Sequence, residues 1–112
     1  MDLAERPQAA ASSSFRADVL ENLAVAALTE LIGTVVSADD RPNLRRKPAP
    51  DLYLLALEQL GLPADDCLVF EDSEPGVLAA KAAGLRCVAL PNAFTLGQNF
   101  SQADLVIAPG QP

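Results

Sequence analysis

Three short polar segments of this sequence carry side chains that could act together on a phosphate group. They are the serines Ser12, Ser13 and Ser14, the single residue Lys47, and the acidic pair Glu71 and Asp72. Hydroxyls and backbone N–H groups at the start of a helix bind phosphate, an ammonium group adds positive charge, and paired carboxylates are hard oxygen ligands for Mg²⁺. Together they indicate a phosphoryl site.

Each segment also has an ordinary structural interpretation. Serines before a helix usually cap it, a loop lysine is usually solvated, and acids before a helix complement the helix dipole. The acidic pair is the sharpest of the three signals. It directly follows the apolar run at 67–70, which would hold both carboxylates near the end of a rigid strand.

The composition removes several other kinds of chemistry. The sequence has no histidine, which excludes imidazole bases, Ser-His or Cys-His nucleophiles and histidine-ligated zinc. Fifteen acidic against eight basic residues give a net charge of −7, which repels a phosphate backbone. Aromatic residues that could stack on bases make up only 4%. We therefore expect no nucleic-acid partner.

The cysteines and the N-terminus favour a cytoplasmic protein. Cys67 and Cys87 are twenty residues apart, and each begins an apolar run where cysteine behaves as a small hydrophobic residue. The first residues are charged and lack an apolar signal segment, and no stretch of 18 uncharged residues occurs. We expect free cysteines, a reducing setting and no membrane partner.

The elements that must position these residues follow from the apolar pattern. The 112 residues fit a single domain, and half are hydrophobic; 1–6 and 109–112 are expected to be loose termini. Strands alternating with helices indicate an α/β fold with a mostly parallel sheet, whose ligands bind at the carboxyl ends of the strands. The expected strands are 8–11, 34–36, 67–70, 85–90 and 105–107, and the expected helices are 15–32, 51–60 and a segment through 77–83.

Three strings in this order and spacing resemble the haloacid dehalogenase superfamily of hydrolases. They are ASSS at 11–14, KPAPDLY at 47–53 and VFEDSEPGVLAAKAAGLRCVALPN at 69–92. Within the superfamily, the sequence is most similar to phosphohydrolases of the β-phosphoglucomutase and phosphoglycolate phosphatase type, and the likeness extends over about 7–107. The resemblance implies a Rossmann-like three-layer sandwich and a small phosphorylated metabolite as substrate.

The resemblance also implies a role for each candidate residue. Ser12 matches the phosphate-binding hydroxyl, and Ser13 would offer its backbone N–H and hydroxyl to the same phosphate. Lys47 matches the lysine that neutralises the nucleophile and the phosphate, with a cis peptide bond to the next residue. Asp72 matches the aspartate that binds the Mg²⁺ cofactor, with Glu71 beside it. Arg46 departs from the glycine that often precedes the lysine.

The larger departure is the missing nucleophile. The family attacks phosphorus with the first aspartate of a DxDxT motif on its first strand, and no DxD occurs in this sequence. The adjacent pairs at 39–40 and 65–66 do not replace it. The cap domain that usually selects the substrate is also absent. We therefore expect weak Mg²⁺ binding and no phosphatase activity of this chain alone; the alternatives are a non-catalytic phosphate-binding or assembly module, or a remnant without a ligand.

The absent first strand also has consequences for the sheet. In the family that strand lies between the strand ending near Ser12 and the strand ending at Phe70, so two inner edges would be exposed here. Two outcomes are open from the sequence. The two strands close directly against each other, or another chain pairs with them, as in a homodimer.

Overall fold

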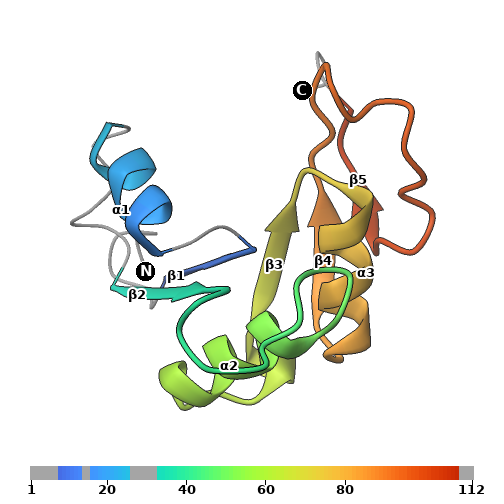
Figure 1. The fold of residues 1–112 in the computed structure, drawn as a ribbon. Helices are drawn as coiled ribbons and strands as arrows, with labels where there is room; N and C mark the ends of the chain where they lie inside the picture. Colours follow the sequence, from blue (N-terminus) through green and yellow to red (C-terminus); the bar gives the residue numbers. More distant parts are fainter. Residues whose placement is uncertain (1–7, 14–15, 26–32, 109–112) are drawn as a thin grey trace.

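The computed structural model describes residues 8–13, 16–25 and 33–108, in which strands and helices alternate (Figure 1). The predicted helix over 15–32 is observed as α1, and its remaining residues and the expected termini at 1–6 and 109–112 lie outside the described part of the chain. The elements are β1 (Ala9–Ser12), α1 (Arg16–Val25), β2 (Thr34–Ser37), α2 (Asp51–Leu60), a 3-10 turn (Ala64–Asp66), β3 (Leu68–Glu71), α3 (Glu74–Ala82), β4 (Arg86–Ala89) and β5 (Leu105–Val106).

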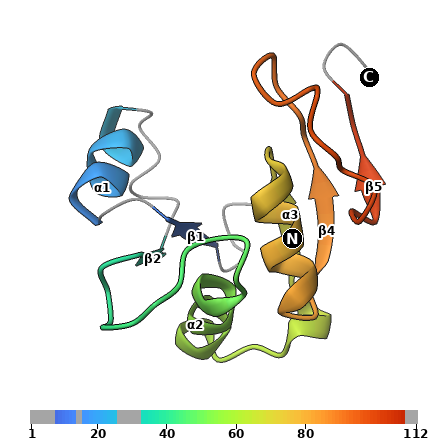
Figure 2. The ribbon, with the colours of Figure 1, turned by 45° about the vertical axis from the view of Figure 1, so that its right-hand side comes forward.

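The strands form two small parallel sheets. β1 pairs with β2, with Ser12 opposite Ser37, and β4 lies between β3 and β5. This confirms the α/β fold with parallel strands. Direct closure of β1 on β3 does not occur, because the described residues form no ladder between these strands. Both views show the two sheets on opposite sides of the molecule, with α2 below them (Figures 1 and 2).

Local sequence signals explain where the helices after β2 and β3 begin and end. Ser73 is the N-cap of α3, and its side chain accepts a hydrogen bond from the backbone N–H of Gly76. α2 ends at Gly61, whose φ of 68° is left-handed and therefore suits glycine. These signals place the carboxyl end of β3 directly against the first turn of α3.

Two apolar cores lie on either side of α2. Leu52, Leu55 and Ala56 of this helix pack with Val36 of β2, whereas Tyr53 packs with the core formed by β3, β4 and α3. Helical geometry makes this division possible, because adjacent residues on a helix point about 100° apart. α2 is therefore the element through which the two sheets are joined.

Both cysteines lie in or against an apolar core. Cys67 and Cys87 are both free, and Cys87 is fully buried in the core that contains Tyr53. Burial, reinforced by the nearby negative charge of Glu71, raises the pKa of Cys87 to about 11, which keeps the thiol protonated. None of the described helices is both long and apolar enough to cross a lipid bilayer.

Candidate functional site

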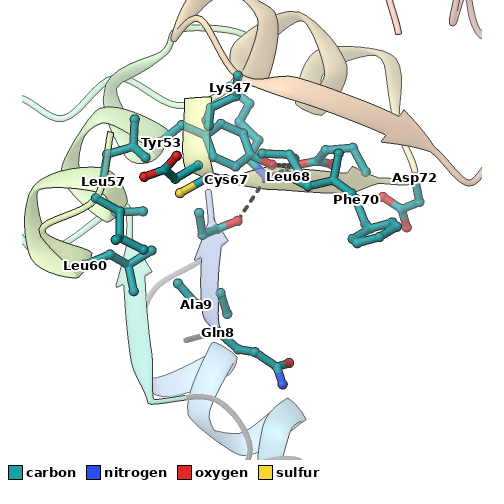
Figure 3. Close-up of a pocket in the computed structure, with 18 of the residues that line it drawn as sticks. Gln8, Ala9, Lys47, Tyr53, Leu57, Leu60, Cys67, Leu68, Phe70 and Asp72 are labelled. Atoms are coloured by element: carbon teal, nitrogen blue, oxygen red, sulfur yellow. Dashed lines mark hydrogen bonds and ion pairs between the residues drawn. The ribbon is translucent and has the colours of Figure 1, made fainter. Parts of the chain in front are cut away.

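Lys47 is the point at which the predicted site residues meet. It lies in the loop between β2 and α2, and its peptide bond to Pro48 is cis, as the resemblance implied. Its Nζ donates hydrogen bonds to the carbonyl oxygen of Ala11 at 2.9 Å and to Oε1 of Glu71 at 2.5 Å (Figure 3). The ammonium group thus connects the carboxyl ends of β1 and β3.

The backbone of the same lysine fixes the serine segment. The N–H of Lys47 donates to Oγ of Ser13 at 3.1 Å, across 34 residues of sequence. Ser12 is the last residue of β1 and is half-buried. Lys47 therefore contacts both Ser13 and Glu71 at the carboxyl ends of the strands, and Ser12 directly precedes Ser13.

The carboxylate of Glu71 is enclosed on several sides. Its side chain is only 8% exposed, and it accepts hydrogen bonds from the ammonium group of Lys47 and from the hydroxyl of Tyr53. Gly76, in the first turn of α3, leaves the space it needs, because a Cβ at that position would overlap the carboxylate. Glu71 therefore acts as an internal counter-ion that holds Lys47 in one place.

Tyr53 contributes from α2 in two ways. Its hydroxyl donates to Glu71, and its ring lies 5.0 Å below Nζ of Lys47, within the range of a cation–π contact. Burial and the nearby negative charge of Glu71 raise the pKa of Tyr53, so the hydroxyl stays protonated and remains a donor. Sequence reasoning missed this residue because an aromatic residue in a helix usually belongs to the core; its place in KPAPDLY was the available signal.

Asp72 lies apart from this group. It is exposed, and its carboxylate accepts a hydrogen bond from Nδ2 of Asn92 at 3.2 Å. Adjacent residues on a strand point to opposite faces, which separates the two acids. The sequence grouped them as a pair, and the structure does not direct them at one point.

This arrangement does not fit a tightly held Mg²⁺ ion. Mg²⁺ requires about six oxygen ligands in near-octahedral geometry. One carboxylate of the acidic pair is occupied by Lys47 and Tyr53, and within residues 8–13, 16–25 and 33–108 no three acidic or cysteine side chains come together as a metal-binding group. Asp72, which is exposed, offers one carboxylate at this edge.

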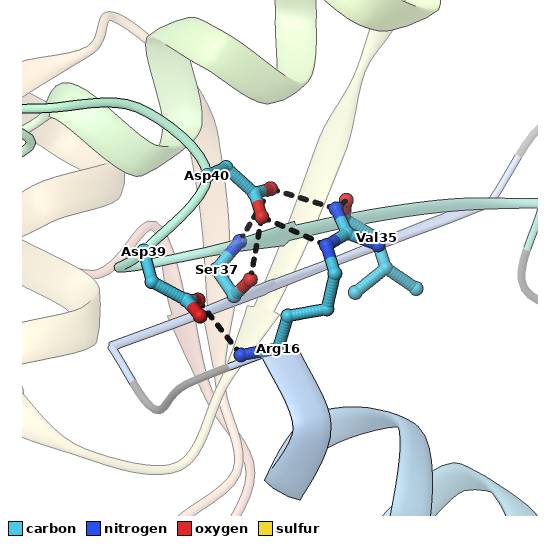
Figure 4. A network of polar contacts seen from close by, with 5 residues as sticks. All are labelled: Arg16, Val35, Ser37, Asp39 and Asp40. Atoms are coloured by element: carbon cyan, nitrogen blue, oxygen red, sulfur yellow. Dashed lines mark hydrogen bonds and ion pairs between the residues drawn. The ribbon is translucent and has the colours of Figure 1, made fainter.

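A second polar network fixes the start of α1 (Figure 4). The guanidinium of Arg16 donates to both carboxylate oxygens of Asp40, at 2.8 and 2.7 Å, and to the carbonyl oxygen of Val35 at 2.6 Å. Ser37 donates its backbone N–H and its hydroxyl to the same carboxylate, and the N–H of Arg16 donates to Asp39. These bonds hold the pKa of Asp40 well below its usual range. Nothing in the sequence signalled a pairing between Arg16 and Asp40.

A cleft of about 910 Å³ lies between the two sheets and ends at Lys47 (Figure 3). Its walls include the edge of β1 from Ala9 to Ala11 and the edge of β3 from Leu68 to Glu71. Leu57 and Leu60 of α2 also line the cleft. The candidate site is therefore one end of a longer, largely apolar groove.

The parallel strands that alternate with helices define a Rossmann-like α/β fold. The family model of the haloacid dehalogenase-like hydrolases matches residues 3–84. The chain belongs to this family.

Known relatives agree with this assignment. CbbY of Rhodobacter capsulatus is 53% identical over 70 residues, which cover 62% of this chain and 30% of CbbY. The bifunctional riboflavin kinase/FMN phosphatase of Arabidopsis thaliana is 37% identical over 102 residues, which cover 90% of this chain and 26% of that protein. Among solved structures, CbbY from Rhodobacter sphaeroides in complex with phosphate superposes with a TM-score of 0.84 and 31% identity, over 93% of this chain and 47% of CbbY. The matched part of this chain thus spans only 26–30% of the length of these two curated relatives.

Proposed function

We propose that this chain carries the phosphate-holding part of a haloacid dehalogenase-like phosphohydrolase that acts on a small phosphorylated metabolite in the cytoplasm. The observation that carries the proposal is the convergence of Ser13, Lys47 and the carboxyl end of β1. A fixed ammonium group beside a hydroxyl and strand-end backbone groups is suited to a phosphate dianion. The phosphate complex of the similar CbbY structure supports the same ligand class.

The proposal assigns binding, and no turnover, to this chain alone. Phosphoryl transfer in this family requires an attacking aspartate, and the sequence has no DxD motif. The groups present can position a phosphate and stabilise its charge, which lowers a barrier only when a nucleophile is supplied. Asp72 would offer one carboxylate to Mg²⁺, so we propose weak binding of the metal unless further ligands come from elsewhere.

A titration with inorganic phosphate tests the binding part of the proposal. We expect saturable shifts of the backbone N–H signals of Ser13 and Lys47 in NMR spectra of the labelled chain. Lys47→Ala should abolish saturation, because the ammonium group is the main positive charge at the site. Lys81→Ala is the matched control: it removes the same charge from α3, where Lys81 pairs with Asp104 at 2.8 Å, and should leave binding intact. Equal binding by both variants would contradict the proposal.

A phosphatase assay tests the second part. With p-nitrophenyl phosphate and Mg²⁺, we expect the purified chain to release no p-nitrophenol above the rate in buffer. Turnover that disappears in Asp72→Asn and persists in Asp65→Asn, a control with an exposed acid before β3, would show that the chain is a complete enzyme.

A non-catalytic phosphate-binding or assembly module is the second candidate. The observation that favours the assembly role is the ion pair between Lys47 and Glu71, which are 15% and 8% exposed, because the lysine already has a counter-ion within the chain. The phosphate titration separates the roles that such a module could have. Saturable phosphate binding without turnover agrees with the hydrolase part and with a phosphate-binding module alike, whereas the absence of phosphate binding contradicts both and leaves the assembly role.

A further inference from the structure

One carboxylate oxygen of the site accepts hydrogen bonds from two different side chains. Oε1 of Glu71 accepts from Nζ of Lys47 at 2.5 Å, and the same oxygen accepts from the hydroxyl of Tyr53. Each oxygen of an ionised carboxylate has two lone pairs, so both donors can bind this atom at once. Lys47 and Tyr53 therefore share the negative charge of Glu71.

The sharing matters because Glu71 is nearly buried. Its side chain is only 8% exposed, and a buried carboxylate that loses its hydrogen-bond donors is strongly destabilised. In the proposed function, a phosphate dianion competes with Glu71 for the positive charge of Lys47. If Lys47 were the only donor to Glu71, phosphate binding would leave this carboxylate without a partner.

Tyr53 is fixed where it can remain a donor to Glu71. Its side chain belongs to the apolar core that contains Val69 of β3 and Val77 of α3, and it is only 8% exposed. A side chain packed in this way cannot follow Lys47 toward a ligand, because core side chains are close-packed in defined rotamers. The hydroxyl of Tyr53 therefore stays beside Glu71 when the lysine moves.

The ring and the hydroxyl of Tyr53 act on different partners. The ring centroid lies 5.0 Å from Nζ of Lys47, which is a cation–π contact, whereas the hydroxyl binds the carboxylate of Glu71. Phenylalanine at this position would keep the first contact and lose the second. The effect of the hydroxyl can therefore be measured with the ring still in place.

We propose that Tyr53 is a positioning residue for phosphate binding. Its hydroxyl keeps the carboxylate of Glu71 hydrogen-bonded while the ammonium group of Lys47 is drawn from Glu71 toward the phosphate. The inference rests on the proposed phosphate site, and it explains how a lysine that is already paired within the chain is still available to a ligand. A tyrosine with a purely structural role would stabilise the fold and leave the phosphate affinity of the folded chain unchanged.

A double-mutant cycle tests the inference. The dissociation constant of inorganic phosphate is measured by NMR titration for the original chain, Tyr53→Phe, Glu71→Gln and the double variant. We expect Tyr53→Phe to weaken phosphate binding at least fivefold, because Glu71 then loses its remaining donor as Lys47 moves. In the Glu71→Gln background the same change should alter the affinity less than twofold, since a neutral amide has no ion pair to lose.

The outcomes of the cycle separate this inference from the proposed function. Equal losses of affinity in both backgrounds would mean that Tyr53 only shapes the site, and no loss in either would mean that its hydroxyl is not used. Both results would overturn the inference and leave the phosphate site intact. Absence of saturable phosphate binding by the original chain would overturn the proposed function, and the inference with it.

A spectroscopic titration needs no variant and therefore does not depend on how the variants fold. Tyr53 is the single tyrosine, and the sequence has no tryptophan, so tyrosine absorption in the near ultraviolet reports on this residue. Its hydroxyl should bond Glu71 more strongly as Lys47 moves away. We expect a saturable red shift with phosphate, with the same midpoint as the NMR signal of Lys47, and none with sodium chloride at equal ionic strength. Phosphate binding without a response of Tyr53, or an equal response to chloride, would contradict the inference.

Discussion

Lys47 makes three kinds of contact from one residue. Its ammonium group donates to the ends of β1 and β3, and its backbone N–H donates to Ser13. In the function proposed above, the same ammonium group also binds the phosphate. Glu71 and the ring of Tyr53 keep the lysine from turning into solvent, since its side chain is only 15% exposed. A lysine so restrained loses little further entropy when it contacts a ligand.

At this scale Asp40 gives a pH prediction. Its pKa is lowered by Arg16 and by Ser37, so the stability it contributes is present above the unfolded value near 4 and is lost as pH falls through the folded value. We expect Asp40→Asn to lower the free energy of unfolding by about 1–2 kcal/mol at pH 7, a modest loss because Arg16 is partly exposed.

Urea titrations from pH 7 to pH 2.5 check this expectation. The difference in the free energy of unfolding between the original chain and Asp40→Asn should shrink below about pH 4, where Asp40 of the unfolded chain becomes protonated. Asp65→Asn serves as the control, because its exposed carboxylate should make little difference at any pH. A difference in the free energy of unfolding that grows as the pH falls would contradict the prediction, because the ionised carboxylate of Asp40 would then not be the stabilising group.

Residue types predicted part of the site. Hydroxyl, ammonium and carboxylate groups after successive strands correctly pointed to Ser13, Lys47 and Glu71 meeting at one edge. Their individual roles stay predictions. The contacts made by Tyr53 and Arg16 could not be predicted, because each depends on a partner 18 or 24 residues away that no local pattern selects.

Among the elements, the turn from β3 into α3 is the most constrained. Gly76 lies in the first turn of the helix, where a Cβ would overlap the carboxylate of Glu71. The position therefore needs glycine for space, whereas most helix positions favour alanine over glycine by about 1 kcal/mol.

A substitution series on the glycines tests this constraint. We expect Gly76→Ala to lower the free energy of unfolding by about 1–3 kcal/mol, because overpacking displaces Glu71 from Lys47. Gly97→Ala is the control, since a Cβ there meets no atom within 4 Å. Urea unfolding of both variants gives the comparison, and a neutral or stabilising Gly76→Ala would show that the helix shifts to make room.

Element positions were largely predictable and sheet assembly was not. Runs such as 67–70 and the β-branched triplet at 34–36 form strands within a residue of the expected limits, because burial and β-propensity act locally. The start of α3 was expected later than Glu74, since Ser73 caps the helix before its apolar residues begin. Whether β1 would pair with β3 depended on backbone groups far apart in sequence, which local patterns leave open.

For the whole molecule, the proposed phosphate binding should increase stability. A ligand that binds the folded chain and not the unfolded chain stabilises it by RT ln(1 + [L]/Kd), about 2.7 kcal/mol at a concentration 100 times Kd. We expect inorganic phosphate at that concentration to raise the free energy of unfolding, measured by urea titration, by this amount. Saturated binding without any change in the free energy of unfolding would mean that phosphate binds the unfolded chain equally well.

The packing of α2 against two separate cores also affects how the molecule unfolds. Because the sheets share no ladder, cooperativity between them must pass through α2 and the contacts of Lys47. The β1–β2 unit is the smaller of the two and should open first, as a subglobal fluctuation that leaves β3, β4 and α3 folded. The protein would then behave as two foldons sharing one helix.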